Sequence, residues 1–281
     1  MSDLGYKNNN QSSLFVSLNS LEEYASDLRA ATEELSKDFH KIYSSTIGRY
    51  PQISSNLLQV EDEHYGVARP KSMNTSTDRQ TSKLLLNGVD YIEYRSMDLN
   101  PFSRVGVESN DLIFLEAFMI YCTLKSSPAM NSQEFINVSK NDLTVATRGR
   151  EPKIKLKKEG KMIDLKSWAN KVFDEITPII ELMGHQSSII EYYRSRLTNP
   201  ELTLSASLLR KLREEEIDYY DLGEQLGMSN KNHYMNKGKD NNSNWNLFEK
   251  EERESLQRNK LLEKLSLDTT FKQYLESYFL D

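Results

Sequence analysis

Glu93 and Arg95 are the two residues of this sequence whose types and spacing best suit chemistry. They lie in a segment, residues 89–99, that alternates with a period of two and is therefore predicted to form a β-strand. Side chains two positions apart point to the same face of a strand, so a carboxylate and a guanidinium should lie side by side. Charges in a strand that is otherwise rich in apolar groups are costly unless something uses them.

A site for Mg²⁺ and an anion would use both of these charges. Glu93 would bind the metal ion, and Arg95 would bind a phosphate or carboxylate group. The alternative is a cross-strand ion pair on a solvated face of the sheet. The residue pattern leaves both interpretations open.

The segments before this strand are predicted to supply the rest of a sheet and the helices that pack on it. A helix should begin after Ser20, because a glutamate follows this serine at the spacing of a capping box. Residues 52–70 look extended. An extended chain here would place Glu61, Glu63 and Tyr65 on one face.

The remainder of the chain is predicted to be mainly helical. Residues 111–124 have the character of a core helix packed on a sheet. Lysines alternate with apolar residues over 153–158, which indicates a solvated strand face or a hairpin. The Asn-rich segment 229–246 is predicted to be a polar, mobile loop. Further helices are predicted at residues 133–147, 164–197, 201–225, 248–267 and 271–279.

Together these elements predict an α+β fold in which an antiparallel sheet precedes a mainly helical region. The expected division is between a partial sheet with its packing helices, residues 1–125, and a mainly helical region, residues 126–281. Of the 281 residues, 37% are hydrophobic and 28% are charged, which fits a soluble globular protein with one large or two small domains.

Composition disfavours several classes of function. The net charge of −6 offers no electrostatic argument for nucleic-acid binding. No stretch approaches the ~20 apolar residues of a membrane span, and the polar N-terminus lacks the apolar core of a signal peptide. The cytoplasm is therefore the expected compartment. The single cysteine, Cys122, excludes an internal disulfide and is predicted to be a buried structural thiol.

The common catalytic and metal-binding motifs are absent from the sequence. No glycine loop has the spacing of the usual phosphate-binding motifs. The four histidines are scattered, which argues against a zinc site. One of them, His64, lies beside the predicted extended segment and is interpreted as a surface histidine.

Five segments, in this order and at comparable spacing, resemble the bacterial (proteobacterial-type) glutamate–cysteine ligases, also called γ-glutamylcysteine synthetases. The strand motif that ends in Asn-Pro-Phe is the most specific of them, and the resemblance runs from residue 1 to about residue 210. The segments are Asp3-Leu4-Gly5-Tyr6, Gln59–Tyr65 with Arg69-Pro70-Lys71, Tyr91–Phe102, Gly149-Arg150-Glu151-Pro152 and Asn199–Ala206.

The resemblance implies a reaction in which ATP phosphorylates the γ-carboxyl of glutamate. The amine of cysteine then attacks the acyl phosphate to give γ-glutamylcysteine. It implies glutamate, cysteine and ATP as substrates, Mg²⁺ as cofactor, and a glutamine-synthetase-like half-barrel as the sheet. It assigns Glu93 to Mg²⁺ and Arg95 to the transferred phosphate. It also assigns Tyr6 and Tyr65 to the border of the pocket for cysteine.

The family protein is close to twice this length, and the resemblance is to its C-terminal half. In the family, the N-terminal half supplies most of the acidic Mg²⁺ ligands, a metal-binding histidine and part of the sheet. A single carboxylate binds Mg²⁺ only weakly. We therefore expect the chain to be inactive by itself and to need that half from a longer parent or from a separate partner.

Two other interpretations stay open at this stage. The chain could be a non-catalytic remnant that pairs with a full-length ligase or another partner through an open sheet. Alternatively, Glu61, Glu63 and Glu93 could build a lone Mg²⁺ site for unrelated phosphoryl chemistry.

Overall fold

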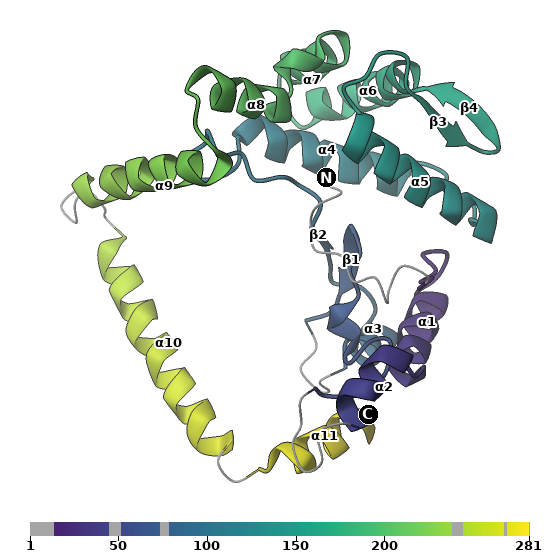
Figure 1. Ribbon diagram of the computed structural model, residues 1–281, viewed down its shortest axis with the longest axis vertical. Helices are drawn as coiled ribbons and strands as arrows, with labels where there is room; N and C mark the ends of the chain where they lie inside the picture. Colours follow the sequence, from purple (N-terminus) through teal and green to yellow (C-terminus); the bar gives the residue numbers. More distant parts are fainter. Residues whose placement is uncertain (1–13, 45–51, 74–78, 238–243, 267–268, 281) are drawn as a thin grey trace. The chain divides into compact units, whose positions relative to one another are not determined.

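The computed structural model describes residues 14–44, 52–73, 79–237, 244–266 and 269–280 (Figure 1). The chain divides into two compact units, and each is described by itself. The strand unit comprises the described residues of 4–97 and 239–281, and the helical unit comprises those of 98–238. The division that the sequence suggests, after residue 125, does not coincide with this one, in which the chain changes unit between Met97 and Asp98.

The strand unit has a small apolar core where helix α1 (Leu21–Glu33) contacts helix α3 (Gln80–Asn87). Helix α1 begins where the sequence predicts, because the side chain of Ser20 accepts a hydrogen bond from the main-chain N–H of Glu23. The core is formed by Val16, Tyr24, Leu28, Ala31, Leu58 and Leu84. The other elements of this unit are α2 (Lys37–Ser44), η2 (Glu61–Glu63), β1 (Ala68–Lys71), β2 (Tyr91–Tyr94), α10 (Trp245–Ser266) and α11 (Phe271–Leu280).

Strands β1 and β2 pair in an antiparallel two-stranded sheet (Figure 1). An antiparallel sheet in an otherwise mainly helical chain confirms the predicted α+β fold. Strand β2 is shorter than the predicted strand of residues 89–99. Among the described residues, one main-chain hydrogen bond continues the pairing at each end, from Asp90 N to Lys71 O at 2.9 Å and from Arg95 N to Val67 O at 2.8 Å. The prediction that residues 52–70 are extended is wrong for Glu61–Glu63, which form a short 3-10 helix.

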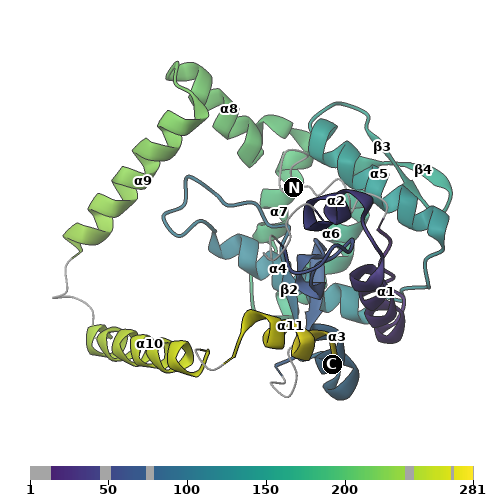
Figure 2. The same ribbon diagram turned by 60° about the horizontal axis from the view of Figure 1, so that its bottom comes forward.

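The helical unit is built around helix α4 (Ser109–Leu124), which contacts α6 (Leu165–Leu182) and α7 (Ser188–Thr198). Figure 2 shows these three helices close together. Among the described residues, the main contacts of α4 are therefore with helices rather than with the sheet that the sequence predicts. The core consists of Ala117, Phe173, Ile176, Ile180, Ile189 and Ile190.

Two long helices that the sequence predicts are each divided in two. The predicted helix 164–197 is interrupted at Gly184, whose φ of 81° is a left-handed conformation that ends α6. The predicted helix 201–225 is interrupted near Glu216, which has a φ of 52°. The resulting helices are α8 (Leu204–Glu214), which follows η3 (Pro200–Leu202), and α9 (Tyr219–Asn236).

Three further predictions for the helical unit can be compared with the structure. Residues 229–236 belong to helix α9, so the predicted loop over 229–246 is wrong there, and residues 238–243 lie outside the described part. The lysine-rich segment 153–158 belongs to a β-hairpin, which is one of the two structures that the sequence predicts for it. Cys122 is exposed, although desolvation raises the pKa of its thiol, so the prediction of a buried thiol is wrong. The remaining elements are α5 (Ser132–Arg148), β3 (Lys155–Lys158) and β4 (Lys161–Asp164).

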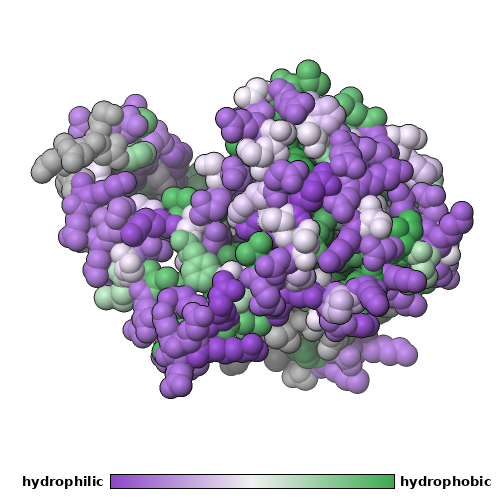
Figure 3. All heavy atoms as spheres, turned by 90° about the horizontal axis from the view of Figure 1, so that it is seen from above, coloured by the Kyte–Doolittle hydropathy of each residue, from purple (hydrophilic) through white to green (hydrophobic). Residues whose placement is uncertain are grey.

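The surface carries many exposed apolar side chains. On the face shown in Figure 3, hydrophilic residues predominate and hydrophobic residues gather in separate small areas. Helix α10 is exposed along most of its length, and so are its large apolar side chains Leu247, Phe248, Leu256, Leu261, Leu262 and Leu265. Among the described residues, no helix combines the length and the apolar character that crossing a membrane requires.

Candidate active site

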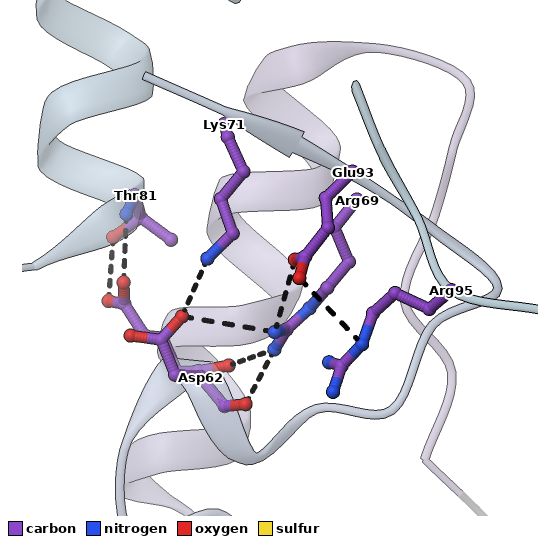
Figure 4. A network of polar contacts seen from close by, with 7 residues as sticks. Asp62, Arg69, Lys71, Thr81, Glu93 and Arg95 are labelled. Atoms are coloured by element: carbon purple, nitrogen blue, oxygen red, sulfur yellow. Dashed lines mark hydrogen bonds and ion pairs between the residues drawn. The ribbon is translucent and has the colours of Figure 1, made fainter. Parts of the chain in front are cut away.

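The pairing of β1 with β2 places Arg69 directly opposite Glu93. Nη1 of Arg69 lies 4.0 Å from Oε2 of Glu93. Nε of Arg95 lies 4.0 Å from Oε1 of the same carboxylate. Figure 4 shows Glu93 between the two arginines. The prediction that Glu93 and Arg95 lie side by side is confirmed, although Arg95 lies just beyond the end of β2 rather than inside a longer strand.

Tyr65 joins this cluster from the loop before β1. The guanidinium carbon of Arg95 lies 5.4 Å from the centroid of the Tyr65 ring, within the range of a cation–π contact. Tyr65 is 50% exposed, so its ring borders open space. Tyr6, the other tyrosine that the family resemblance singles out, lies outside the described residues. Of the four site residues predicted from the sequence, the structure thus brings together Tyr65, Glu93 and Arg95.

The carboxylate of Glu93 fits the role of a metal ligand but cannot form a complete metal site. Its Oε2 is buried and accepts no hydrogen bond from the described residues. The side chain as a whole is 40% exposed. It therefore keeps a lone-pair oxygen for a hard cation such as Mg²⁺. No group of three or more carboxylate, histidine or cysteine side chains suited to a metal occurs in the part of the chain that the structure describes.

Glu61 has a structural role rather than the role of a metal ligand. It is 2% exposed and lies on η2. Its carboxylate accepts hydrogen bonds from Arg79 Nε at 2.8 Å, Thr81 N at 2.8 Å and Thr81 Oγ1 at 2.6 Å. Glu63 caps the main-chain N–H of Gln59 at 2.7 Å. The interpretation of Glu61, Glu63 and Glu93 as one Mg²⁺ site is therefore wrong, because the carboxylate of Glu61 already accepts three hydrogen bonds.

Asp62 and Lys71 complete the network of polar contacts in Figure 4. Lys71 Nζ lies 2.9 Å from Asp62 Oδ1, and Arg69 Nη1 lies 3.9 Å from the same oxygen. Sequence reasoning quoted Arg69 and Lys71 as part of a motif but assigned them no role. The pairing register of β1 and β2 places Arg69 in the site. The sequence does not reveal this register, because the four residues of β1 carry no pattern that marks where the strand begins and ends.

His64 is half-buried next to this network, so its interpretation as a surface histidine is wrong. Burial, and then the positive charge of Arg69, lower the pKa of His64 from 6.5 to about 4. The imidazole is therefore neutral at pH 7, and it does not add a third positive charge beside Glu93.

This shift predicts a pH-dependent stability. The unfolded chain binds a proton at His64 below about pH 6.5, whereas the folded chain does so only below about pH 4. His64 therefore favours folding fully above pH 6.5, and this contribution is lost as the pH falls to 4, for a total of up to about 3 kcal/mol. We expect the free energy of unfolding of wild type and His64→Gln, measured in urea, to converge by about this amount between pH 7 and pH 4. A pH-independent difference between the two proteins would contradict the burial of a neutral His64.

Comparisons with known proteins agree with the fold and identify the family. A model of the glutamate–cysteine ligase family matches residues 1–145, which include the whole Tyr65–Glu93–Arg95 cluster. The glutamate–cysteine ligase of Alcanivorax borkumensis is 31% identical over 296 aligned positions, which cover 100% of this chain and 55% of the relative. That of Shewanella pealeana is 31% identical, covering 99% of this chain and 54% of the relative.

Two solved structures share the fold. The crystal structure of glutamate–cysteine ligase from Francisella tularensis in complex with AMP superimposes with a TM-score of 0.85 at 24% identity. It covers 99% of this chain and 55% of that one. A bifunctional glutathione synthetase from Pasteurella multocida gives a TM-score of 0.59 at 22% identity, over 83% of this chain and 26% of that one.

The fold is therefore of the α+β class and is shared with these two proteins. Within that class, this chain belongs to the glutamate–cysteine ligase family. It spans about half the length of the curated relatives that it matches.

Proposed function

We propose that this chain is the C-terminal part of a glutamate–cysteine ligase and contributes to the ATP-dependent formation of γ-glutamylcysteine, the first step of glutathione synthesis. The observation that carries the proposal is the cluster of Tyr65, Glu93 and Arg95, which lies inside the segment that the family model matches. The relative from Francisella tularensis was crystallised with AMP, which supports a nucleotide as one ligand of the shared fold.

In this proposal Arg95 binds the phosphoryl group that passes from ATP to the γ-carboxylate of glutamate. Its planar guanidinium can donate two parallel hydrogen bonds to phosphate oxygens and so stabilise charge that builds up during transfer. The amine of cysteine then attacks the acyl carbon, the phosphate leaves, and the amine proton is lost. Tyr65, with Tyr6, borders the space in which cysteine binds, and its ring keeps Arg95 in place from one side.

Glu93 is one ligand of Mg²⁺ in this proposal. A bound Mg²⁺ ion would neutralise phosphate oxygens and so lower the barrier to phosphoryl transfer. One carboxylate cannot hold the ion in the required geometry. The remaining ligands must therefore come from groups other than the described residues, which hold no such cluster.

The sheet indicates where those groups could be supplied. Strands β1 and β2 form a two-stranded sheet, and no further strand pairs with them among the described residues. Tyr91, Ile92 and Tyr94 on β2 are at least 38% exposed. An unpaired edge with apolar side chains suits the addition of further strands. We propose that the other part of the family fold, in the same polypeptide or in a separate one, extends this sheet and adds the missing metal ligands. Because free cysteine must stay reduced, we expect this reaction in the cytoplasm.

The deciding experiment is an assay of γ-glutamylcysteine formation from ATP, Mg²⁺, glutamate and cysteine. The purified chain is assayed alone and together with a separately expressed N-terminal part of a homologous ligase. Product only in the mixture is the expected result. Product from the chain alone would show that its own residues complete the metal site.

A second candidate function is a non-catalytic partner that binds a full-length ligase through the open sheet. The exposed side chains on β2 favour it. No product in either arm, from a chain shown to be folded by circular dichroism, together with co-elution with a full-length ligase, would establish this alternative and overturn the catalytic proposal.

A further inference from the structure

Helix α10 carries apolar side chains that are open to solvent near both of its ends. Among the described residues, no other helix or strand of the strand unit packs along it. Most of the stability of a helix in a protein comes from the packing of its apolar face, so a helix like α10 gains stability when a partner covers that face. The large apolar side chains near its ends are each at least 53% exposed: Leu247, Phe248, Leu261, Leu262 and Leu265.

Most of these side chains belong to one stripe along the helix. Alternating steps of four and three residues define the stripe, which is the spacing of the contact seam in a coiled coil. The stripe is apolar at both ends, and in its middle it is first acidic and then basic. It consists of Leu247, Glu251, Glu254, Arg258, Leu261 and Leu265, and Phe248 and Leu262 border it on one side.

The charged middle of the stripe is also open to solvent. The side chains of Glu254 and Arg258 are 42% and 63% exposed. Nη1 of Arg258 lies 3.8 Å from Oε2 of Glu254, and its Nη2 lies 3.9 Å from Oε2 of Glu251. Exposed ion pairs of this kind contribute little free energy. The charged groups can therefore turn to opposite charges on a second helix at little cost.

The stripe is complementary to itself when a second copy of α10 runs in the opposite direction. If the two copies cross near their midpoints, Leu247 of each copy lies opposite Leu265 of the other. In the same arrangement, Glu254 of each copy lies opposite Arg258 of the other. Every contact of such a two-fold pair occurs twice, so two ion pairs lie at the centre and apolar layers lie at both ends.

The charged residues also select the direction of the pair. Two parallel copies would place Glu254 opposite Glu254 and Arg258 opposite Arg258, and such contacts between like charges are repulsive. The antiparallel pair has a less favourable layer where Glu251 lies opposite Leu261. The carboxylate of Glu251 keeps Arg258 of its own helix beside it in that layer. Polar residues in the seam thus reduce affinity and in return fix register and direction.

We propose that helix α10 is a surface for self-association, and that its partner is a second copy of this chain bound in the antiparallel direction. The partner is identified by the order of apolar, acidic and basic residues, which is matched by its own reverse. Because the interface is short and polar at its centre, association is weak and depends on concentration. The inference is independent of the proposed function, since neither Glu93 nor Arg95 belongs to α10, and it goes beyond it by assigning a further interaction surface.

The first test is sedimentation velocity of the full chain between about 1 and about 100 µM. Wild type should change from monomer to dimer over this range. Arg258→Glu makes the middle of the stripe entirely acidic, so this variant should stay monomeric at about 100 µM. The matched control is Lys260→Glu, which makes the same change of charge on the opposite face of α10 and should dimerise as wild type does. A monomeric wild type, or a dimer that persists in Arg258→Glu, would overturn the proposal.

A mixture of two variants separates the loss of an ion pair from the loss of the helix. Glu254→Arg and Arg258→Glu should each be monomeric alone, because each places like charges opposite one another. In an equimolar mixture, the two positive charges of one chain lie opposite the two negative charges of the other. The mixture should therefore dimerise within about threefold of the wild-type concentration, and circular dichroism checks the helix content of each variant. A mixture that stays monomeric would contradict the assigned charge pairs.

Disulfide trapping tests the direction of the pair. Leu247→Cys and Leu265→Cys are made separately in a Cys122→Ser background, because Cys122 is exposed. In an antiparallel pair these two positions meet, whereas the two copies of one position are about 27 Å apart. A disulfide between the two variants should therefore exceed the disulfides within each variant by at least about tenfold. Predominant disulfides within each variant would overturn the antiparallel pair.

One further measurement distinguishes a second copy from the other part of the family fold. The N-terminal part of a homologous ligase is titrated with wild type and with Arg258→Glu. Binding that is equal for both leaves α10 to the second copy and supports the proposal. A wild type that is monomeric and binds this part, with the binding lost in Arg258→Glu, would assign α10 to that part instead and overturn the proposal while supporting the proposed function.

Discussion

Replacing Glu93 by glutamine should lower the rate of γ-glutamylcysteine formation by at least about a hundredfold in the reconstituted assay. The amide has nearly the shape of the carboxylate but lacks the negative charge that would bind Mg²⁺. The fold should survive, because Oε2 accepts no hydrogen bond and the two ion pairs of Glu93 are long, at 4.0 Å each. The measurement is the initial rate of product formation over a range of Mg²⁺ concentrations, with circular dichroism to confirm that the variant is folded.

The matched control is Glu63→Gln, in a carboxylate that is close in sequence to Tyr65 but points elsewhere. Oε2 of Glu63 accepts a hydrogen bond from the main-chain N–H of Gln59, and an amide oxygen can accept the same bond. Its rate should therefore stay within a few-fold of wild type. If Glu93→Gln and Glu63→Gln gave similar, nearly normal rates, Glu93 would not be a metal ligand and the long ion pairs would be its only role.

The central part of the candidate site could be predicted from sequence because it depends on local geometry. Glu93 and Arg95 are two residues apart, and a strand or a nearly extended segment places both on one side whether β2 ends at Tyr94 or at Leu99. The error in the length of the strand therefore did not affect the site. Tyr65 was reached through the family resemblance rather than through any pattern in the residues.

The buried hydrogen bonds between Glu61, Arg79 and Thr81 could not be predicted, because they join segments that are distant in the sequence. The sequence places Glu61 on one face of an extended segment, yet the partners of its carboxylate are Arg79 and Thr81, some twenty positions later. The alternation of residues around Glu61 predicted an extended segment. The three hydrogen bonds to its buried carboxylate stabilise the observed 3-10 helix by more than a weak local preference favours extended structure. The same limit applies to Arg69, whose importance follows from pairing register alone.

The sequence predicted which segments are helical better than it predicted where most of the helices end. Helix α1 begins at the predicted capping residue, because a cap is a local hydrogen bond. The break between α6 and α7 falls at Gly184, and an isolated glycine in an apolar pattern does not by itself show whether a helix stops there. Helix α9 runs through the asparagines of 229–236, residues with only moderate helix preference.

Replacing Glu61 by glutamine should reduce the free energy of unfolding by about 3–5 kcal/mol, the largest stability effect that we expect from a single change in the strand unit. The carboxylate is 2% exposed, and its partner Arg79 is 7% exposed. Glutamine would leave the charge of Arg79 without its buried counter-charge and would turn an amide N–H₂ toward groups that are themselves donors. The measurement is equilibrium unfolding in urea at pH 7, with the exposed ion-pair variant Glu254→Gln as a control that should change stability little.

A double variant tests the reason for this loss. Glu61→Leu combined with Arg79→Met removes both charges, so no uncompensated charge stays buried and part of the lost stability should return relative to Glu61→Gln. The carbonyl groups of η2 would still be less firmly held, because Thr81 loses its acceptor. The double variant should therefore be more stable than Glu61→Gln but less stable than wild type. A double variant no more stable than Glu61→Gln would show that the lost hydrogen bonds, and not the uncompensated charge of Arg79, cause the loss of stability.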